Sequence, residues 1–211
     1  ADQAPQKWDQ TVDLLVVGAG GAGLASAVSA AQHGVKNIVV LEKMPFFGGN
    51  TSISGGGFNS VDPVRQGKQK IKDSPELHAR QTLAGGDGRA NPELVKTMTA
   101  NSYDAIKWLQ DMGMKFKDDV YQIYGGLYPR CHAPYGSLGS DYIKVLKPQC
   151  DKEGINILTN YRVVRIFREN QLSGKVLGVE YVDKDGQHKT VKAQKAVIVA
   201  TGGFGANPEM R

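Results

Sequence analysis

The stretch LLVVGAGGAG, residues 14–23, decides the fold of this chain. It overlaps the apolar run Val12–Val17, broken only by Asp13, which has the length and the β-branched content of a strand buried on both faces. Small residues then recur at helical spacing from Ala22 to Ala31, so a helix is predicted directly after the strand. The turn between them carries three glycines at G-x-G-x-x-G spacing: Gly18, Gly20 and Gly23. This pattern is typical of a turn that binds a dinucleotide.

Each glycine has a physical role in such a turn. Gly18 permits the tight turn, Gly20 lets the backbone approach a pyrophosphate, and Gly23 allows the helix to pack closely on the strand. The helix N-terminus adds unpaired N–H groups and the positive end of its dipole. A tight strand–helix turn without a ligand is the alternative interpretation of the same spacing.

A second strand supports the dinucleotide interpretation. The segment Asn37–Leu41 is mostly apolar, and Glu42 stands at its end, 19 residues after Gly23. A carboxylate at this position accepts hydrogen bonds from a ribose, and its negative charge argues against a 2′-phosphate. A solvated charge at a strand end is the alternative for Glu42, but the βαβ context favours ribose binding.

A second glycine-rich block, residues 48–59, indicates which dinucleotide is bound. A nicotinamide-binding unit would continue from Glu42 into another helix and strand, whereas GGNTSISGGGFN is a long polar loop. Such a loop is suited to packing its backbone against more of the same cofactor. A mobile surface loop is the alternative. Together with the first glycine turn, the block favours FAD.

The segments VVGAGGAG, LEK, GGNTSISGGGFN and ATGGFG together resemble the flavoprotein family of fumarate reductase and succinate dehydrogenase. The likeness is greatest to the soluble flavocytochrome c type fumarate reductases and to urocanate reductase. It implies an α/β fold: a Rossmann-like FAD-binding domain with a βαβ nucleotide fold, a helical insertion and a β-hairpin, as the N-terminal part of a larger flavoprotein. It also implies a set of FAD contacts: Gly18, Gly20, Ala22, Gly23, Glu42, Lys43, Gly49, Asn50, Thr51, Gly55, Gly56, Gly57, Val163 (through its backbone, at the adenine), Thr201 and Gly202.

The position of Asn50 bears on how the cofactor is attached. Family members that bind FAD covalently carry a histidine immediately before the threonine of this loop, and here that position is Asn50. The resemblance therefore implies non-covalent FAD. The loop with Arg130 and His132 also approaches the flavin in the family, but Ala133 replaces an arginine of close relatives. For His132, a hydrogen bond that structures the loop is favoured over contact with the flavin.

The resemblance implies an oxidoreductase that reduces an activated C=C bond of a small unsaturated acid, such as fumarate or urocanate, by hydride transfer from flavin N5. The alternatives are a flavin dehydrogenase working in the oxidative direction, on succinate or a 3-ketosteroid, and a nucleotide-binding module without turnover. In the family, the groups that bind the substrate and donate the proton follow the segment after ATGG. We therefore expect no catalytic residue between Ala1 and Arg211.

The same resemblance implies partners beyond this chain. They are the capping and C-terminal domains of the same flavoenzyme, and a haem or FMN electron donor, as a domain or a separate protein. Any haem would lie elsewhere in the parent protein. The resemblance implies a periplasmic location, and we recognise no signal peptide in this chain.

The composition is that of a globular domain. The 211 residues are 40% hydrophobic and 22% charged, enough for one sizeable core. The net charge of +5 is spread over basic residues interleaved with acidic and apolar ones, so no nucleic-acid partner is predicted. No apolar run reaches the length of a membrane span. Cys131, Cys150 and the four dispersed histidines lack metal-ligand or haem-attachment spacing, and free thiols are favoured over a disulfide.

The remaining segments complete the expected fold. Residues 1–11 are interpreted as a tail or linker before an FAD-binding domain of residues 12–211. Two inserted helices are predicted, the first capped by Ser74 or Asp73 and the second starting at Asn91-Pro92 and stopping at Gly113. The second helix is expected to bury Leu94, Met98, Ser102, Ala105 and Leu109. A helix from about Ser140, a capping role for His33, and strands within 155–169, 175–194 and 195–201 follow, with a hairpin at Asp185-Gly186.

Overall fold

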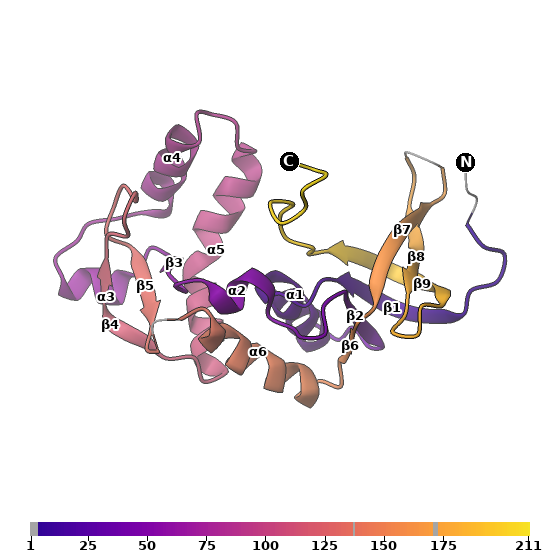
Figure 1. Ribbon diagram of the computed structural model, residues 1–211. Coiled ribbons are helices and arrows are strands. Elements are labelled where there is room, and N and C mark those ends of the chain that lie inside the picture. Colours follow the sequence, from indigo (N-terminus) through magenta and orange to yellow (C-terminus); the bar gives the residue numbers. More distant parts are fainter. Residues whose placement is uncertain (1–3, 137, 171–172) are drawn as a thin grey trace. The chain divides into compact units, whose positions relative to one another are not determined.

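The computed structural model describes residues 4–136, 138–170 and 173–211. The chain forms two compact units, one comprising residues 1–52 and 146–211 and the other residues 53–145. The first unit contains a six-stranded sheet with the order β6-β2-β1-β9-β8-β7 (Figure 1). Its strands are β1 (Gln10–Val17), β2 (Ile38–Glu42), β6 (Asn156–Thr159), β7 (Arg162–Arg168), β8 (Val176–Val182) and β9 (His188–Val199).

The parallel half of this sheet is the predicted βαβ unit. Strand β1 pairs in parallel with β2 and with β9, and β2 pairs in parallel with β6. Helix α1 (Gly21–Gln32) connects β1 to β2. It packs closely on β1, since a Cβ on Gly23 would lie 3.4 Å from Cγ1 of Val16. His33 ends the helix as its C-cap, and its Nδ1 lies 2.8 Å from the Ser29 carbonyl oxygen, which confirms the expected capping role.

The antiparallel half is a meander of β7, β8 and β9. Gly186, with φ of +77°, lies in the predicted turn between β8 and β9. The sequence suggested a break near Gln194, but β9 is one continuous strand. Strand β1 pairs with it from Val191 to Val199, and this pairing shifts register between Ala193 and Ala196, where the break was expected.

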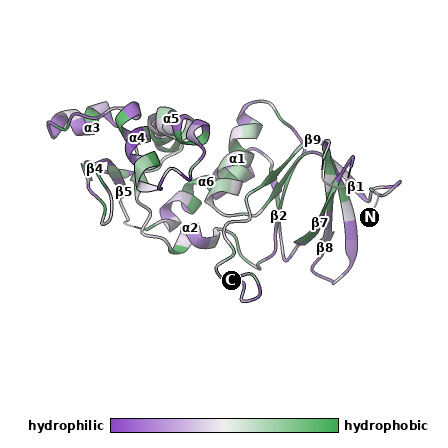
Figure 2. Cartoon of the chain, turned by 90° about the horizontal axis from the view of Figure 1, so that it is seen from above, coloured by the Kyte–Doolittle hydropathy of each residue, from purple (hydrophilic) through white to green (hydrophobic). Residues whose placement is uncertain are grey.

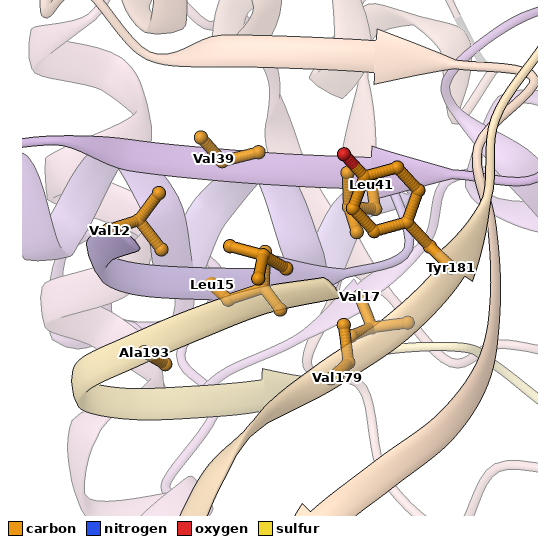
Figure 3. Packing of buried hydrophobic residues seen from close by; sticks show 9 residues of the cluster. Val12, Leu15, Val17, Val39, Leu41, Val179, Tyr181 and Ala193 are labelled. Atoms are coloured by element: carbon orange, nitrogen blue, oxygen red, sulfur yellow. The ribbon is translucent and has the colours of Figure 1, made fainter. Parts of the chain in front are cut away.

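The core of the first unit lies where the two halves of the sheet face each other. Figure 3 shows the ring of Tyr181, from β8, beside Leu41, from β2, although β1 and β9 separate these strands in the sheet. The sheet must therefore curl strongly, as twisted sheets do. The buried cluster consists of Val12, Leu15, Val17, Val39, Leu41, Val179, Tyr181, Val191 and Ala193.

The prediction of a tail or linker over residues 1–11 is wrong for residues 8–11. Gln10 and Thr11 already belong to β1. The ring of Trp8 packs edge-on against Phe167 with centroids 5.6 Å apart, and the Asp9 carboxylate accepts a hydrogen bond from the Thr190 N–H (2.7 Å). The sequence did not indicate this packing, because residues 1–11 are mostly polar and Trp8 alone provides the aromatic contact.

The second unit combines helices with a small antiparallel sheet of order β3-β5-β4. Ser74 caps the first predicted helix, its Oγ accepting from the Leu77 N–H (3.1 Å), and Asn91 caps the second. Both inserted helices are thereby confirmed. The elements are β3 (Phe58–Asn59), α3 (Pro63–Lys68), α4 (Pro75–Gly85), α5 (Pro92–Asp111), β4 (Phe116–Tyr121) and β5 (Cys131–Pro134); α2 (Gly49–Ile53) and α6 (Ser140–Lys152) run across the unit boundaries.

The predicted buried face of α5 is wrong in its first half. Leu94 and Met98 are 69% and 46% exposed. The buried residues of the helix are Val95, Thr99, Ser102, Ile106 and Leu109. Val95, Thr99 and Ile106 are buried where the preceding residue was predicted, whereas Ser102 and Leu109 are buried as predicted. Figure 2 shows hydrophobic and hydrophilic colours side by side along α4 and α5. Within the described residues, no helix is long and apolar enough to cross a membrane.

Candidate functional site

Three strands of the first unit end together at the carboxyl edge of the parallel half of the sheet. The Gly18 N–H donates to the Leu41 carbonyl (2.8 Å), and the Ala200 N–H donates to the Val17 carbonyl (2.8 Å). These bonds join the ends of β1, β2 and β9. In open α/β sheets, ligands bind outside the carboxyl ends of the strands. The predicted site residues of this unit should therefore gather here.

The three glycines differ in what the fold itself requires of them. Gly18 has a φ of +103°, and a Cβ there would lie 2.4 Å from the Ala200 carbonyl oxygen. A Cβ on Gly23 would lie 1.9 Å from the Gly18 carbonyl oxygen. By contrast, the atom nearest to a Cβ on Gly20 would be the Gly48 oxygen, at 3.9 Å. Gly18 and Gly23 are needed for folding, whereas Gly20 leaves open space beside the backbone.

The N-terminus of α1 is suited to an anion. Its N-cap is Gly20, which has no side chain to cap the helix, and its first turn consists of Gly21, Ala22 and Gly23. One N–H is already used, because Gly21 donates to Oγ1 of Thr51 (3.1 Å). Phosphates bind well at such helix ends, where N–H groups and the helix dipole act together.

Glu42 is a buried, oriented carboxylate rather than a solvated strand-end charge. The residue is 9% exposed. Its Oε2 accepts from the Ala19 N–H and its Oε1 from the Met44 N–H, both at 2.8 Å. A carboxylate offers about four acceptor positions. Each oxygen therefore retains capacity for one hydroxyl, which is the geometry that a ribose diol requires.

The second glycine block is fixed to the first. The Gly48 N–H donates to the Ala19 carbonyl (2.7 Å), and Gly48 forms a parallel bridge with Gly20. Thr51 adds its bond to Gly21. Gly49 has a φ of +49°, and both Gly49 and Asn50 are exposed at the start of α2. The start of this block is thus tied to the glycine turn by hydrogen bonds.

Two further predicted positions of the first unit lie at the same edge. The Tyr161 N–H donates to the backbone carbonyl of Glu42 (2.8 Å), which brings the beginning of β7 and its second residue, Val163, to the end of β2. On the other side of β1, the Cα of Thr201 lies 3.3 Å from the Cβ position of Gly18. Ala22, Lys43, Thr201 and Gly202 are exposed.

The remaining predicted positions, Gly55, Gly56 and Gly57, belong to the second unit. Gly56 has a φ of +71°, and its carbonyl accepts from the buried Tyr142 hydroxyl (2.7 Å), whose pKa is raised by burial. A Cβ on Gly57 would lie 2.7 Å from Sγ of Cys131. Packing inside this unit already accounts for glycine at 56 and 57. Their role as cofactor contacts stays a prediction.

Arg130 and His132 are both buried and engaged inside the second unit. Arg130 donates to Asp73 through Nε (2.9 Å) and Nη2 (2.7 Å) and to Gln81 through Nη1 (2.8 Å). Burial opposes ionisation of Asp73, but the bonds from Arg130 and Gln66 outweigh it and hold the pKa of this carboxyl below its usual value. The hydrogen bonds of His132 confirm the loop-structuring role favoured for it.

Sequence analysis missed the acidic partners of these two residues, Asp62 and Asp73. Asp62 caps α3 by accepting from the Val64 and Arg65 N–H groups. The Asp62-Pro63 dipeptide is the usual signal for such a helix start, and it could have been found. Cys131 and Cys150 are buried free thiols, as favoured, and burial raises the pKa of Cys150 to about 11.

The fold and the site together define a dinucleotide-binding α/β protein with a Rossmann-like glycine turn and an oriented carboxylate at the end of the second strand. Residues 13–211 match the family described as FAD binding domain, and the chain belongs to this family. The residues described above fit that cofactor, because the open space at Gly20, the N-terminus of α1, which has no side-chain cap, and the oriented Glu42 carboxylate are what a pyrophosphate and a ribose need.

Known relatives are larger reductases. The chain is 37% identical over 201 residues to a fumarate reductase (cytochrome) of Shewanella frigidimarina, covering 94% of this chain and 34% of that protein. It is 39% identical over 215 residues to a urocanate reductase of Eggerthella lenta, covering 99% of this chain and 34% of that protein. Among solved structures, the open conformation of a flavocytochrome c3 fumarate reductase matches with a TM-score of 0.88 and 33% identity, over 96% of this chain and 36% of that one. The chain thus spans about a third of the length of these relatives.

Proposed function

We propose that this chain is the FAD-binding part of an oxidoreductase that reduces the activated C=C bond of a small unsaturated acid, with fumarate and urocanate as first candidates. The observation that carries the proposal is the Glu42 carboxylate, held by two backbone N–H groups beside the free N-terminus of α1. The reductases named above support the reaction class.

In this proposal, each part of the site takes one part of the cofactor. The backbone at Gly18 and Gly20, with the first turn of α1, binds the pyrophosphate, and Glu42 binds the ribose hydroxyls. The backbone of Val163 meets the adenine. The other proposed contacts are Ala22, Gly23, Lys43, Gly49, Asn50, Thr51, Gly55, Gly56, Gly57, Thr201 and Gly202. When bound, FAD supplies the hydride chemistry, and the protein supplies binding and orientation.

Two features of the chain refine the proposal. Asn50 offers a carboxamide, which is no nucleophile, where a histidine would be needed for covalent attachment, so we infer non-covalent FAD. Residues 48–59 contain no arginine, lysine or histidine, and Arg130 and His132 are engaged internally. We therefore assign the binding of substrate carboxylates and the donation of the proton to other parts of the enzyme.

The resemblance to soluble flavocytochrome c reductases also underlies three broader proposals. The parent protein has capping and C-terminal domains that complete the active site. It receives electrons from a haem or FMN domain or protein. It works in the periplasm.

Anaerobic stopped-flow spectroscopy of the intact flavoprotein tests the function. We expect the flavin, once reduced by dithionite, to be reoxidised by fumarate or urocanate, while succinate leaves it reduced. Reduction of the oxidised flavin by succinate or a 3-ketosteroid would instead show the oxidative direction. A flavin that none of these compounds oxidises or reduces would overturn the proposal in favour of a nucleotide-binding module.

A further inference from the structure

His132 has only hydrogen-bond acceptors around its ring. The residue lies on β5 and is fully buried. Its Nδ1 is 3.1 Å from the Phe58 carbonyl oxygen and 3.1 Å from the Arg130 carbonyl oxygen, and its Nε2 is 3.0 Å from Oδ2 of Asp62. Carbonyl oxygens only accept, so Nδ1 carries a proton. The charge on the ring then depends on whether Asp62 also acts as an acceptor.

Asp62 is surrounded by donors. Its Oδ1 accepts from the Val64 N–H (2.8 Å) and the Arg65 N–H (2.9 Å), and its Oδ2 accepts from Nη1 of Arg65 (2.9 Å). Burial opposes ionisation, but the bonds from Arg65 and His132 outweigh it and keep the pKa of Asp62 below its usual value. An ionised carboxylate has no proton to give to Nε2. The geometry at Nε2 therefore also suits an N–H donor.

We propose that His132 is a buried imidazolium, paired with Asp62, and that it positions the glycine-rich loop of the second unit, residues 55–59, through the Phe58 carbonyl. This rests on the proposed function, in which that loop contacts FAD. His132 is thus a positioning residue, not a catalytic one.

His132 is one of several residues of the second unit that hold the loop. Phe58 pairs with His132 in the register between β3 and β5, and the Tyr142 hydroxyl donates to the Gly56 carbonyl (2.7 Å). The Phe116 ring stands edge-on to the imidazole, with centroids 5.9 Å apart. Charge-assisted hydrogen bonds are about twice as strong as neutral ones. A charged ring fixes the Phe58 carbonyl more firmly than a neutral one.

Other charged groups lie close to the pair. Arg65 shares Oδ2 of Asp62 with His132. Gln66 links Asp62 to the Asp73–Arg130 pair, accepting from the Asp62 N–H (2.9 Å) and donating to Oδ2 of Asp73 (2.9 Å). Asp73 therefore provides a matched control: it is another buried, ion-paired carboxylate of the same unit, and its own hydrogen bonds go to Arg130, Gln66 and the Ser74 N–H.

The charge is tested by ¹⁵N NMR of histidine-labelled intact holoprotein at pH 7.5. We expect the wild-type His132 ring to show two protonated nitrogens. In Asp62→Asn the amide keeps one oxygen for the α3 cap and turns its NH₂ toward Nε2, so the ring should become neutral with the proton on Nδ1. One unprotonated nitrogen in the wild type would overturn the charged pair.

The positioning role is tested by His132→Leu, with Asp73→Asn as control. We expect the Kd for FAD to rise about tenfold in His132→Leu, a change of about 1.4 kcal/mol, together with a shifted visible flavin band. Asp73→Asn should lose thermal stability but keep the wild-type band. Should His132→Leu not fold, His132→Gln takes its place, because one amide cannot donate to both Phe58 and Asp62.

Two results keep the ideas separate. A His132 variant with the wild-type Kd and flavin band would overturn the positioning role. A wild-type protein that binds no FAD would overturn the proposed function instead, and the NMR result would still decide the charged pair.

Discussion

Replacing Gly20 with alanine tests whether a phosphate approaches the glycine turn, because the protein itself leaves room for the added carbon. Gly20 has φ −79° and ψ −174°, which any residue can adopt, and the atom nearest to the new Cβ would be 3.9 Å away. That is an ordinary van der Waals distance. We expect the free energy of unfolding to stay within about 1 kcal/mol of the wild type.

Cofactor binding should respond very differently. If the pyrophosphate lies against this backbone, the new methyl group occupies its space, and such overpacking costs about 1–3 kcal/mol. The Kd for FAD should then rise about five- to a hundred and fiftyfold. Titration of the deflavinated protein with FAD, followed by flavin fluorescence, measures the Kd, and thermal unfolding without FAD measures stability.

Two other glycines serve as controls. Gly23→Ala puts a Cβ 1.9 Å from the Gly18 carbonyl oxygen, so it should destabilise the fold itself. Gly67→Ala, inside α3, should leave the Kd unchanged and raise the free energy of unfolding by about 0.4–1 kcal/mol, since within the described residues no atom that could clash lies within 4 Å of the added carbon. A Gly20→Ala protein with wild-type affinity would refute the reasoning, because the open space would then have no ligand in it.

Further predictions concern attachment, the ribose, acid stability and the core. Acid precipitation should leave the yellow colour in the supernatant, because we expect no covalent bond between Asn50 and FAD; a yellow pellet would contradict this. Glu42→Ala should raise the Kd for FAD about ten- to a hundredfold by titration, since bonds to charged groups contribute about 1.5–3 kcal/mol. Burial opposes ionisation of Asp73, but the bonds from Arg130 lower its pKa. The ionised carboxylate therefore stabilises the fold above about pH 4, and this stability is lost as the pH falls further. Asp73→Asn should therefore lose less stability than the wild type in urea melts taken below that pH. Ile106→Ala should lower the free energy of unfolding by about 2–5 kcal/mol. Leu94→Ala, at an exposed position, should change it by no more than about 0.5 kcal/mol. Equal losses would contradict the buried face of α5.

The βαβ unit could be predicted because its constraints are local. Gly18 and Gly23 are required by contacts within the turn and with the strand end beside it, and a 19-residue spacing brings Glu42 to the end of the adjacent strand. The role of Glu42 follows from that placement. The N–H groups of Ala19 and Met44 that orient it could not be foreseen, because they depend on the backbone path of the turn.

The face of α5 could not be predicted in the same way. Leu94 and Val95 are neighbours in sequence and both apolar, so the helical period fits a stripe through either residue. In the structure Val95 and Thr99 are the buried residues, and the Thr99 hydroxyl donates a hydrogen bond to the Lys96 carbonyl (3.3 Å). A threonine whose hydroxyl donates to a carbonyl of its own helix can be buried at little cost. A search for apolar residues at helical spacing does not identify such a position.

The pairing of His132 with Asp62 lies further still from what a sequence shows, since 70 residues separate them. Neither belongs to a recognisable spacing, and their contact depends on the register between β3 and β5 and on the start of α3. The Asp62-Pro63 dipeptide alone predicts Asp62 as the N-cap of a helix. Only the fold shows that the same carboxylate also receives an imidazole.

In the proposed function, the carboxylate of Glu42 serves folding and binding with the same atoms. Its bonds to the Ala19 and Met44 N–H groups join the glycine turn to the end of β2, so the turn and the ribose acceptor are fixed before any ligand arrives. Binding then needs little ordering of side chains, and ordering costs about 0.5–1.5 kcal/mol for each immobilised side chain. Gly48 reinforces the arrangement by donating to the Ala19 carbonyl, on the opposite side of the same residue. Ala19 is thus held from both sides, with Gly20 directly after it as the one position of the turn where the backbone stays open.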